Sequence, residues 1–404
     1  MSNPGDFRRA PSSIATHDQR RQWLASEKQA LIALAGQVTH TEYLEETSQR
    51  LDEELRRSGP WTAAEELHGH AAELARRRGD APTAVAALIR RGIVLQRLDR
   101  NEQAKEVLAD AVDSAKVNEL EAEMAIALNH MGMALRRLPG GFRQGFTAHG
   151  RAMRILRHLG SPALVDAQMY LAVCQFFLGN YRSSTNWCRR TIALPDLGDA
   201  ERRQFGIAYA TSLMAMMSIN SGRPDEGMEG ATRALALYKD LGHDHGVAQC
   251  QYAEGVALVA LTRTGEGADR VQTALHAFER LESRQGVASA LRKLGAVHAQ
   301  TGRMAEAQEL LHRSLVHFVQ LRSNLGQAEA SNDMGGTLLL EDGHDQAKPW
   351  FQRAQDHAIA APSWFEEARA IAGLLRCGQT PSRLLIRRAE LEERMGFSVR
   401  VPPI

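Results

Sequence analysis

The chain has 404 residues, of which 49 are basic and 48 acidic, so its formal net charge is only +1. Such a balance gives no global field that would attract nucleic acid or an anionic membrane, and nucleic acid is therefore disfavoured as a partner. The longest apolar runs, 213–217 and 256–261, are far shorter than the roughly 18 residues that span a bilayer. Four cysteines without a C-x-x-C spacing argue against a zinc site and a disulfide framework. We expect a cytoplasmic protein without a membrane partner.

Residues 1–21 are polar, are dotted with arginine and hold no apolar stretch, which predicts a disordered leader rather than a signal peptide. Residues 22–80 are expected to form an N-terminal helical cap with a degenerate first repeat. Within this segment, 61–78 matches the second helix of the repeat described below, while its partner, 43–55, carries Asp52 in place of a small residue. Terminal repeats that face water are expected to depart from the pattern in this way.

Residues 81–363 hold seven units in which a small residue recurs at three positions. The second position follows the first by twelve or thirteen residues, and the third follows seven later. The first column reads Gly92, Gly132, Ala172, Ala215, Gly255, Gly295, Gly335, the second Ala104, Gly145, Ser184, Gly227, Gly267, Ala307, Ala347, and the third Ala111, Ala152, Thr191, Ala234, Ala274, Ser314, Ala354. Two antiparallel helices approach closely only where their contact positions carry small side chains, so these columns predict a stack of helix pairs.

The period of the repeat is 40 residues in the second half of the chain, where Gly206, Gly246 and Gly286 follow one another at that step. One unit departs from the pattern, because Pro195 is expected to cut its second helix short and to leave a loop at 196–199. Residues 364–397 are predicted to be capping helices, and 398–404 a tail. The sequence therefore predicts an all-α fold, a right-handed superhelical solenoid of antiparallel helix pairs with repeats of about 40 residues.

The three columns match the tetratricopeptide consensus over roughly 43–395, and the chain resembles that family. A second resemblance depends on the segment 23–31, Trp-Leu-Ala-Ser-Glu-Lys-Gln-Ala-Leu, followed by long repeats. It is to the C-terminal tetratricopeptide sensor region of actinobacterial antibiotic regulatory proteins and related signal-transduction ATPases. In those proteins a Trp-x-x-x-Glu helix leads into the repeats, and Trp23 and Glu27 hold these positions. The resemblance implies a sensor, either a standalone homologue or a fragment of a larger regulator.

No G-x-x-x-x-G-K-[ST], G-x-S-x-G or H-E-x-x-H motif occurs, so neither an enzyme nor a cofactor is predicted. The H-x-H pairs His68 with His70 and His243 with His245 would point to different faces of a helix. We interpret them as solvated or capping histidines and expect no metal site.

The candidate partner-binding residues lie on the first helix of each pair, which lines the concave side of the superhelix in this family. They are Asn129, Arg136, Arg137, Met169, Phe176, Ser212, Met216, Tyr252, Arg292 and Asn332. Asn129 and Asn332 resemble the groove asparagines that pair with a bound peptide backbone, since an amide both donates and accepts. Arg136 suits a carboxylate on the partner. For the two asparagines the alternative is an exposed helix residue without a function, and for Arg136, Arg137, Phe176 and Met216 it is burial between neighbouring repeats.

The sequence favours a non-enzymatic scaffold that binds a protein or peptide in its concave groove, as the sensor part of a bacterial transcriptional or signalling regulator. The first alternative is a receptor of the quorum-sensing type, which modulates a response regulator through a bound signal peptide. The second alternative is a solenoid that binds nucleic acid. The sequence leaves a homodimer open.

Overall fold

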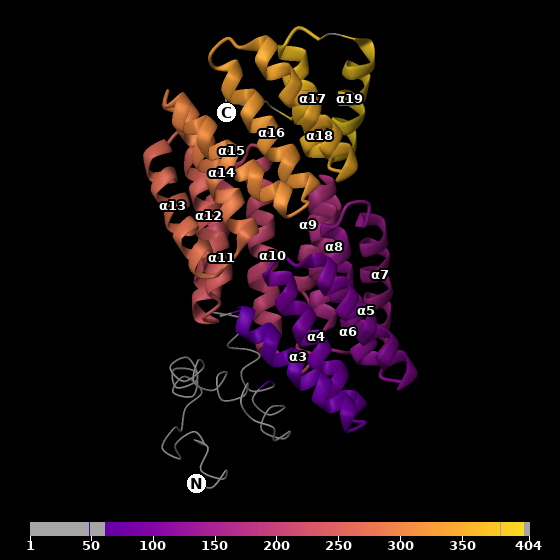
Figure 1. Cartoon of the computed structure of the whole chain (residues 1–404). Coiled ribbons are helices and arrows are strands. Elements are labelled where there is room, and N and C mark those ends of the chain that lie inside the picture. The colour runs from indigo at the N-terminus through magenta and orange to yellow at the C-terminus, as the bar shows by residue number, and fades with distance from the viewer. Residues whose placement is uncertain (1–47, 49–60, 380, 400–404) are drawn as a thin grey trace.

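The computed structural model describes Ser48 and residues 61–379 and 381–399, and every regular element in these residues is a helix (Figure 1). The all-α prediction is confirmed. The helices are α3 (Trp61–Arg77), α4 (Ala81–Arg97), α5 (Asn101–Val117), α6 (Glu121–Arg137), α7 (Phe142–His158), α8 (Leu164–Leu178), α9 (Tyr181–Ile192), α10 (Ala200–Asn220), α11 (Pro224–Asp240), α12 (Asp244–Ala260), α13 (Thr264–Arg280), α14 (Arg284–Gln300), α15 (Met304–Gln320), α16 (Asn324–Leu339), α17 (His344–Ala360), α18 (Trp364–Arg376) and α19 (Ser382–Met395).

Helix starts in the second half of the chain recur at a 40-residue step. His243, Ser283, Ser323 and Ser363 are the N-cap residues of α12, α14, α16 and α18. Each side chain accepts a hydrogen bond from the backbone N–H three residues later, which satisfies a donor that has no partner within the helix. His243 is therefore a capping residue, as the sequence indicates.

The small columns let the two helices of a pair touch through their backbones. A Cβ atom added to Gly255 of α12 would lie 2.6 Å from Cγ2 of Val271 and 2.9 Å from the backbone oxygen of Gly267. A Cβ atom added to Gly267 of α13 would meet Val259 and the oxygen of Gly255 at the same two distances. Neither position has room for a larger residue, so the glycines set how closely the helices pack.

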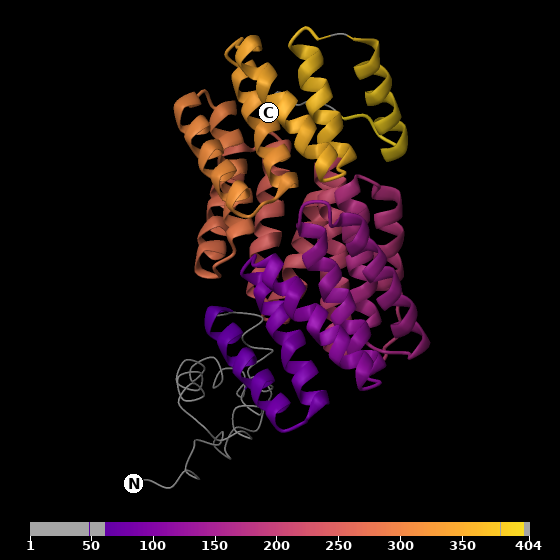
Figure 2. The ribbon, with the colours of Figure 1, turned by 45° about the vertical axis from the view of Figure 1, so that its right-hand side comes forward.

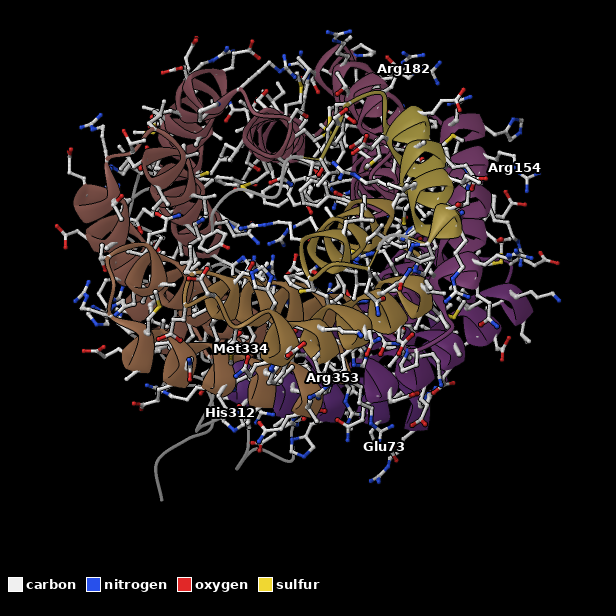
Figure 3. The ribbon with its side chains drawn as sticks, turned by 90° about the horizontal axis from the view of Figure 1, so that it is seen from above. Glu73, Arg154, Arg182, His312, Met334 and Arg353 are labelled. Atoms are coloured by element: carbon white, nitrogen blue, oxygen red, sulfur yellow. The ribbon has the colours of Figure 1, made fainter. Side chains whose placement is uncertain are left out.

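The helix pairs stack in sequential order, with the first helix of each pair on the inside. Consecutive first helices, α4, α6, α8, α10, α12, α14, α16 and α18, contact one another along the whole stack, whereas no comparable contact joins second helices in the described chain. The first helices are therefore closer together, and the stack curves around them. Seen from above, the helices form a ring with side chains projecting into it (Figure 3).

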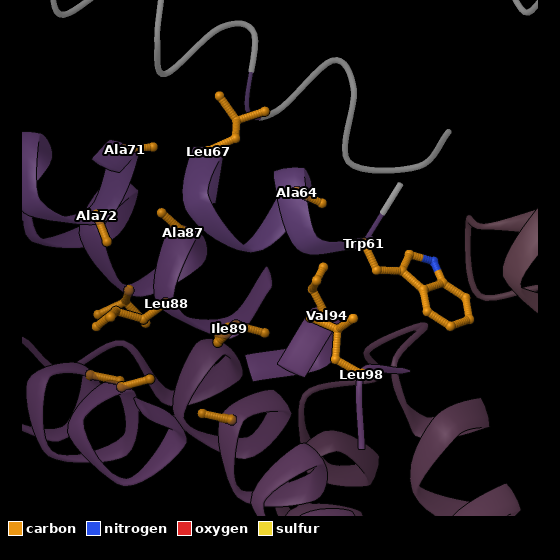
Figure 4. Close-up of a cluster of buried hydrophobic side chains, with 14 of the residues drawn as sticks. Trp61, Ala64, Leu67, Ala71, Ala72, Ala87, Leu88, Ile89, Val94 and Leu98 are labelled. Carbon is orange, nitrogen blue, oxygen red and sulfur yellow. The ribbon is translucent and has the colours of Figure 1, made fainter. Parts of the chain in front are cut away.

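Successive turns of the superhelix touch at two places. At the first, here called the N-terminal seam, the Trp61 ring lies 6.0 Å from the His245 ring, and the Gln285 backbone N–H donates to Oδ2 of Asp99 at 3.0 Å. Leu281 joins the apolar cluster around Trp61, part of which is drawn in Figure 4. These contacts bring α3 and α4 against the segment from α12 to α14.

The second place of contact, the C-terminal seam, joins α8 and α9 to the C-terminal helices, as Figure 2 shows. The Tyr181 ring stacks on Phe397 with centroids 5.1 Å apart and lies 6.3 Å from Phe365. Gly179 has the positive φ that ends α8, and Sδ of Met395 lies 3.2 Å from where its Cβ would be. The superhelix thus closes on itself and encloses its inner face.

The irregular repeat predicted at Pro195 is confirmed. Helix α9 ends at Ile192, and α10 begins at Ala200 after the N-cap Asp199. The predicted leader, the first helix of the cap at 43–55 apart from Ser48, and most of the tail lie outside the described residues. No helix among those that are described is long and apolar enough to cross a membrane.

Candidate functional site

The inner face is formed by the first helices and has two electrostatically different regions. The first, here called the cationic end, holds Arg97, Arg136, Arg137, Tyr170 and Tyr209 on α4, α6, α8 and α10. The Arg97, Arg136 and Arg137 charges all act on the Tyr209 hydroxyl. Because Arg97 lies on α4 and Tyr209 on α10, side chains from separate repeats converge inside the superhelix.

Arg136 is a cation without an acidic partner among the described residues. Its guanidinium lies over the Phe177 ring, 4.4 Å from the centroid, and its Nε is buried without a hydrogen bond. Burial lowers the pKa of Arg136 to about 10, and the charge of Arg137 adds to that effect. The group still carries its charge at neutral pH. A desolvated, unpaired guanidinium is costly, so an anion from a partner would stabilise it.

The other two arginines of the cationic end are committed to the N-terminal seam. Nη1 of Arg137 donates to the Gln96 carbonyl at 3.0 Å and to Oδ1 of Asp99 at 3.2 Å. Nη1 of Arg97 lies 3.2 Å from Nδ1 of His245. Burial raises the pKa of Asp99, although the nearby Arg137 charge opposes the rise. Arg136 is therefore the cation of this region that is available to a partner.

The second region, here called the charge network, lies on α14, α16 and α18. Oδ2 of Asp333 accepts from Nη1 of Arg292 at 2.5 Å, and its Oδ1 accepts from Nη2 of Arg369 at 2.6 Å. Arg369 also pairs with Glu366 at 2.9 Å, and Nε of Arg292 lies 3.6 Å from Glu329. Burial opposes the charge of Asp333, but the two arginines outweigh it and hold its pKa below the usual value.

Two groups at the edge of the charge network have pKa values displaced toward neutrality. Burial raises the pKa of Glu329 to about 7, against the attraction of Arg292. Burial lowers the pKa of Lys293 to about 8, with Asp333 opposing the shift. Lys293 makes no hydrogen bond or ion pair with any residue that the structure describes, so it is a second inner cation open to a partner.

Three predicted groove residues are buried instead of lining the inner face. Asn129 and Asn332 are 1% and 3% exposed, and Met169 is 2% exposed. The Asn129 amide oxygen lies 2.8 Å from Nδ1 of His149 on the paired helix, and Nδ2 of Asn332 donates to Glu366 at 2.9 Å and to its carbonyl. The hydrogen bonds place Asn129 against α7 and Asn332 against α18. They therefore point toward neighbouring helices, and the expectation that they face a groove is wrong.

The remaining predicted residues are half-buried, and several have partners within the chain. Phe176 stacks on Tyr181 at 5.5 Å, and the Ser212 hydroxyl donates to the Tyr209 carbonyl at 2.8 Å. Nη2 of Arg292 donates to the Tyr252 hydroxyl at 3.5 Å. Met216 packs against a small alanine cluster. The structure thus brings Arg136, Arg137 and Ser212 near the cationic end and Tyr252 and Arg292 into the charge network.

Sequence reasoning missed Tyr170, Lys293 and Asp333. All three lie two residues before a residue of the first small column, whereas the candidate residues such as Asn129 and Asn332 lie three residues before it. A search of that neighbouring position for polar and aromatic residues would have found them. Arg369 and Tyr209 do not occupy that position, since Tyr209 lies six residues before Ala215 and α18 follows the last complete set of small columns.

No group of three metal-ligating side chains occurs within 61–379 and 381–399 or at Ser48. His245, one member of the H-x-H pairs, lies in the N-terminal seam, where burial and the Arg97 charge lower its pKa well below the usual value. Its ring serves packing in the seam.

A family model described as tetratricopeptide repeat matches residues 286–360, the segment that holds α14 to α17. The same nested helix pairs extend back to α4. The family match therefore covers residues 286–360, and the rest of the stack shares its helix-pair architecture. No curated protein matches the sequence of the chain.

Solved structures share the fold of this repeat protein at low sequence identity. A Rap protein complexed with Competence and Sporulation Factor has a TM-score of 0.55 at 14% identity, covering 87% of this chain and 99% of that one. The apo quorum sensor NprR from B. thuringiensis has a TM-score of 0.50 at 12% identity, covering 84% and 94%. A signal transduction ATPase with a tetratricopeptide repeat sensor from Pyrococcus horikoshii has a TM-score of only 0.43 at 12% identity, covering 82% and 52%. The first two share the all-helical fold of this chain.

Proposed function

We propose that this repeat protein is a non-enzymatic scaffold that binds a peptide or protein segment along its inner face, with an acidic group of the ligand on Arg136. The observation that carries the proposal is the unpaired, largely desolvated Arg136 guanidinium inside the superhelix. Natural proteins pair buried charges, so a cation left without an acid in this position fits a partner that supplies one.

The distribution of charge suggests how the ligand would be oriented. In the charge network each acidic side chain already has a basic partner. Among the described residues of that network, Lys293 is the one cation that has no acidic partner. The cationic end therefore attracts an acidic group more strongly than the charge network does. The hydroxyls of Tyr170 and Tyr209 stand beside the arginines and supply further hydrogen-bond donors for a carboxylate.

The fold relatives bear on the biological role. The Rap structure is complexed with Competence and Sporulation Factor, and NprR is described as a quorum sensor. We assign this chain, on the same fold, to the sensor or interaction part of a bacterial signalling or transcriptional regulator. The candidate binding residues on the inner face are then Arg136, Lys293, Tyr170, Tyr209 and Tyr252.

The experiment is a selection of random peptides displayed on phage against the immobilised full chain, followed by binding measurements on the selected peptides by fluorescence anisotropy. Recovered peptides are expected to be acidic, and Arg136→Gln is expected to weaken their binding by about tenfold to a hundredfold, since a desolvated charge-assisted hydrogen bond is worth roughly 1.5–3 kcal/mol. Arg233→Gln is the matched control, because Arg233 is an exposed arginine on the outer helix α11.

Circular dichroism and melting of both variants establish that the fold is retained. Peptides that bind Arg136→Gln as tightly as the unmodified chain would contradict the assignment of the site. A selection that recovers no acidic peptides would contradict the chemistry of the ligand.

A further inference from the structure

Two neighbouring second helices carry a concentration of arginine on the outside of the ring. Helix α7 has four arginines and no acidic residue, and α9 has three arginines and no acidic residue. All seven are exposed: Arg143, Arg151, Arg154, Arg157, Arg182, Arg189 and Arg190. Figure 3 shows Arg154 and Arg182 pointing outward on the same side of the ring. We call this surface the arginine face.

The arginine face is unlike the rest of the outer surface. Every other second helix from α5 to α17 has at least two acidic residues and at least as many acidic as basic ones. No arginine of the face forms an ion pair with the residues that are described here, and Arg190 instead lies over the Trp187 ring at 5.0 Å. Seven cations gathered in a chain of net charge +1 are not explained by helix stability, because like charges on one helix repel.

A shallow depression of about 410 Å³ lies beside these arginines, between the start of α6 and the second half of α7. Its lining comprises the apolar side chains of Met124 and Ile155 and the polar side chains of Glu121, Arg151, Arg154 and His158. Two more apolar side chains are exposed nearby, Phe146 of α7 at 36% and Leu159, which directly follows α7, at 42%. Exposed apolar side chains therefore occur on α7 together with the arginines.

We infer that the arginine face is a second docking surface, independent of the inner face, for an acidic segment of a partner protein. The acidic side chains of that segment pair with Arg151, Arg154 and their neighbours, while one of its apolar side chains enters the depression beside Ile155. Charge complementarity identifies the acidic character of the occupant. The apolar side chains and Glu121 favour a protein over nucleic acid, since a phosphate backbone offers nothing to cover the apolar groups and is repelled by a carboxylate.

The test uses the full chain and three fluorescent probes: a helical peptide of glutamate and leucine, the same peptide with serine in place of leucine, and a short random-sequence DNA duplex. The leucine peptide is expected to bind more tightly than the serine peptide and than the duplex. Its affinity is expected to fall with increasing salt, because exposed charges are screened. Arg151→Glu with Arg154→Glu is expected to weaken its binding about tenfold or more, since both attractions become repulsions.

The matched control is Arg233→Glu with Arg313→Glu, which makes the same change of charge on exposed positions of α11 and α15. The control variant is expected to bind the leucine peptide within about twofold of the unmodified chain. If both double variants bound the leucine peptide equally weakly, the effect would be one of net charge, and the assignment of the arginine face as the docking surface would be overturned. Tighter binding of the duplex, or equal binding of the two peptides, would overturn the assignment to an acidic protein segment.

Discussion

Gly255 tests whether the small columns set the packing of the solenoid. In Gly255→Ala, the new methyl group would lie 2.6 Å from Val271 and 2.9 Å from the backbone oxygen of Gly267, so α12 and α13 must move apart. Such overpacking costs about 1–3 kcal/mol, while replacing a helical glycine by alanine returns up to about 1 kcal/mol. We expect a net loss of up to about 2 kcal/mol.

The control is Gly150→Ala in the middle of α7, where an added Cβ would meet nothing within 4 Å. There the substitution should stabilise the protein by about 0.5–1 kcal/mol, because alanine loses less backbone entropy in a helix. Thermal melting followed by circular dichroism measures both, and the two variants should shift Tm in opposite directions by about one to two degrees. Equal stabilisation by both substitutions would refute the close approach of the paired helices.

Two further predictions concern the charge network and the N-terminal seam. Because the Glu329 pKa is raised from 4.5 to about 7, the native state binds more protons than the unfolded chain in that window, and stability falls as pH rises through it. Glu329→Gln should remove this pH dependence, so between pH 5 and pH 8 the free energy of unfolding of the variant should rise by about 1–3 kcal/mol relative to that of the unmodified chain. A difference in melting temperature between the two proteins that stays constant across this range would contradict the prediction. In Asp99→Gly, glycine tolerates the positive φ of 58° at this position, but the carboxylate that accepts from the Gln285 backbone N–H is lost. Hydrogen exchange at the Gln285 amide should therefore become faster. Unchanged exchange would contradict the contact across the N-terminal seam.

The stacked helix pairs could be predicted from the sequence because their cause is local and periodic. Gly255 and Gly267 occupy fixed positions in their repeat, and the spacing of small residues predicts that the paired helices touch at both positions. Pro195 similarly marks the short helix α9, which ends three residues before it, because proline removes a backbone hydrogen-bond donor and disfavours continuation of the helix. The 40-residue step of N-cap residues gives the helix starts in the same way.

The arrangement of the inner face could not be predicted, because it depends on contacts between distant parts of the chain. Asp99 and Gln285 are 186 residues apart, and only the pitch of the superhelix brings them together. The prediction that Asn332 faces the groove was wrong for a related reason, because its hydrogen-bond partner Glu366 belongs to the next repeat. A single helix pair shows which face is buried against its own partner, but the curvature of the stack decides which side chains remain open to a ligand.

The central claim is that the inner face binds an acidic segment at Arg136, and a crystal structure of the full chain with a selected acidic peptide tests it most directly. We expect peptide density inside the superhelix, with a carboxylate within hydrogen-bonding distance of the Arg136 guanidinium. Density on the outer helices alone, with the inner side chains unchanged, would contradict the account.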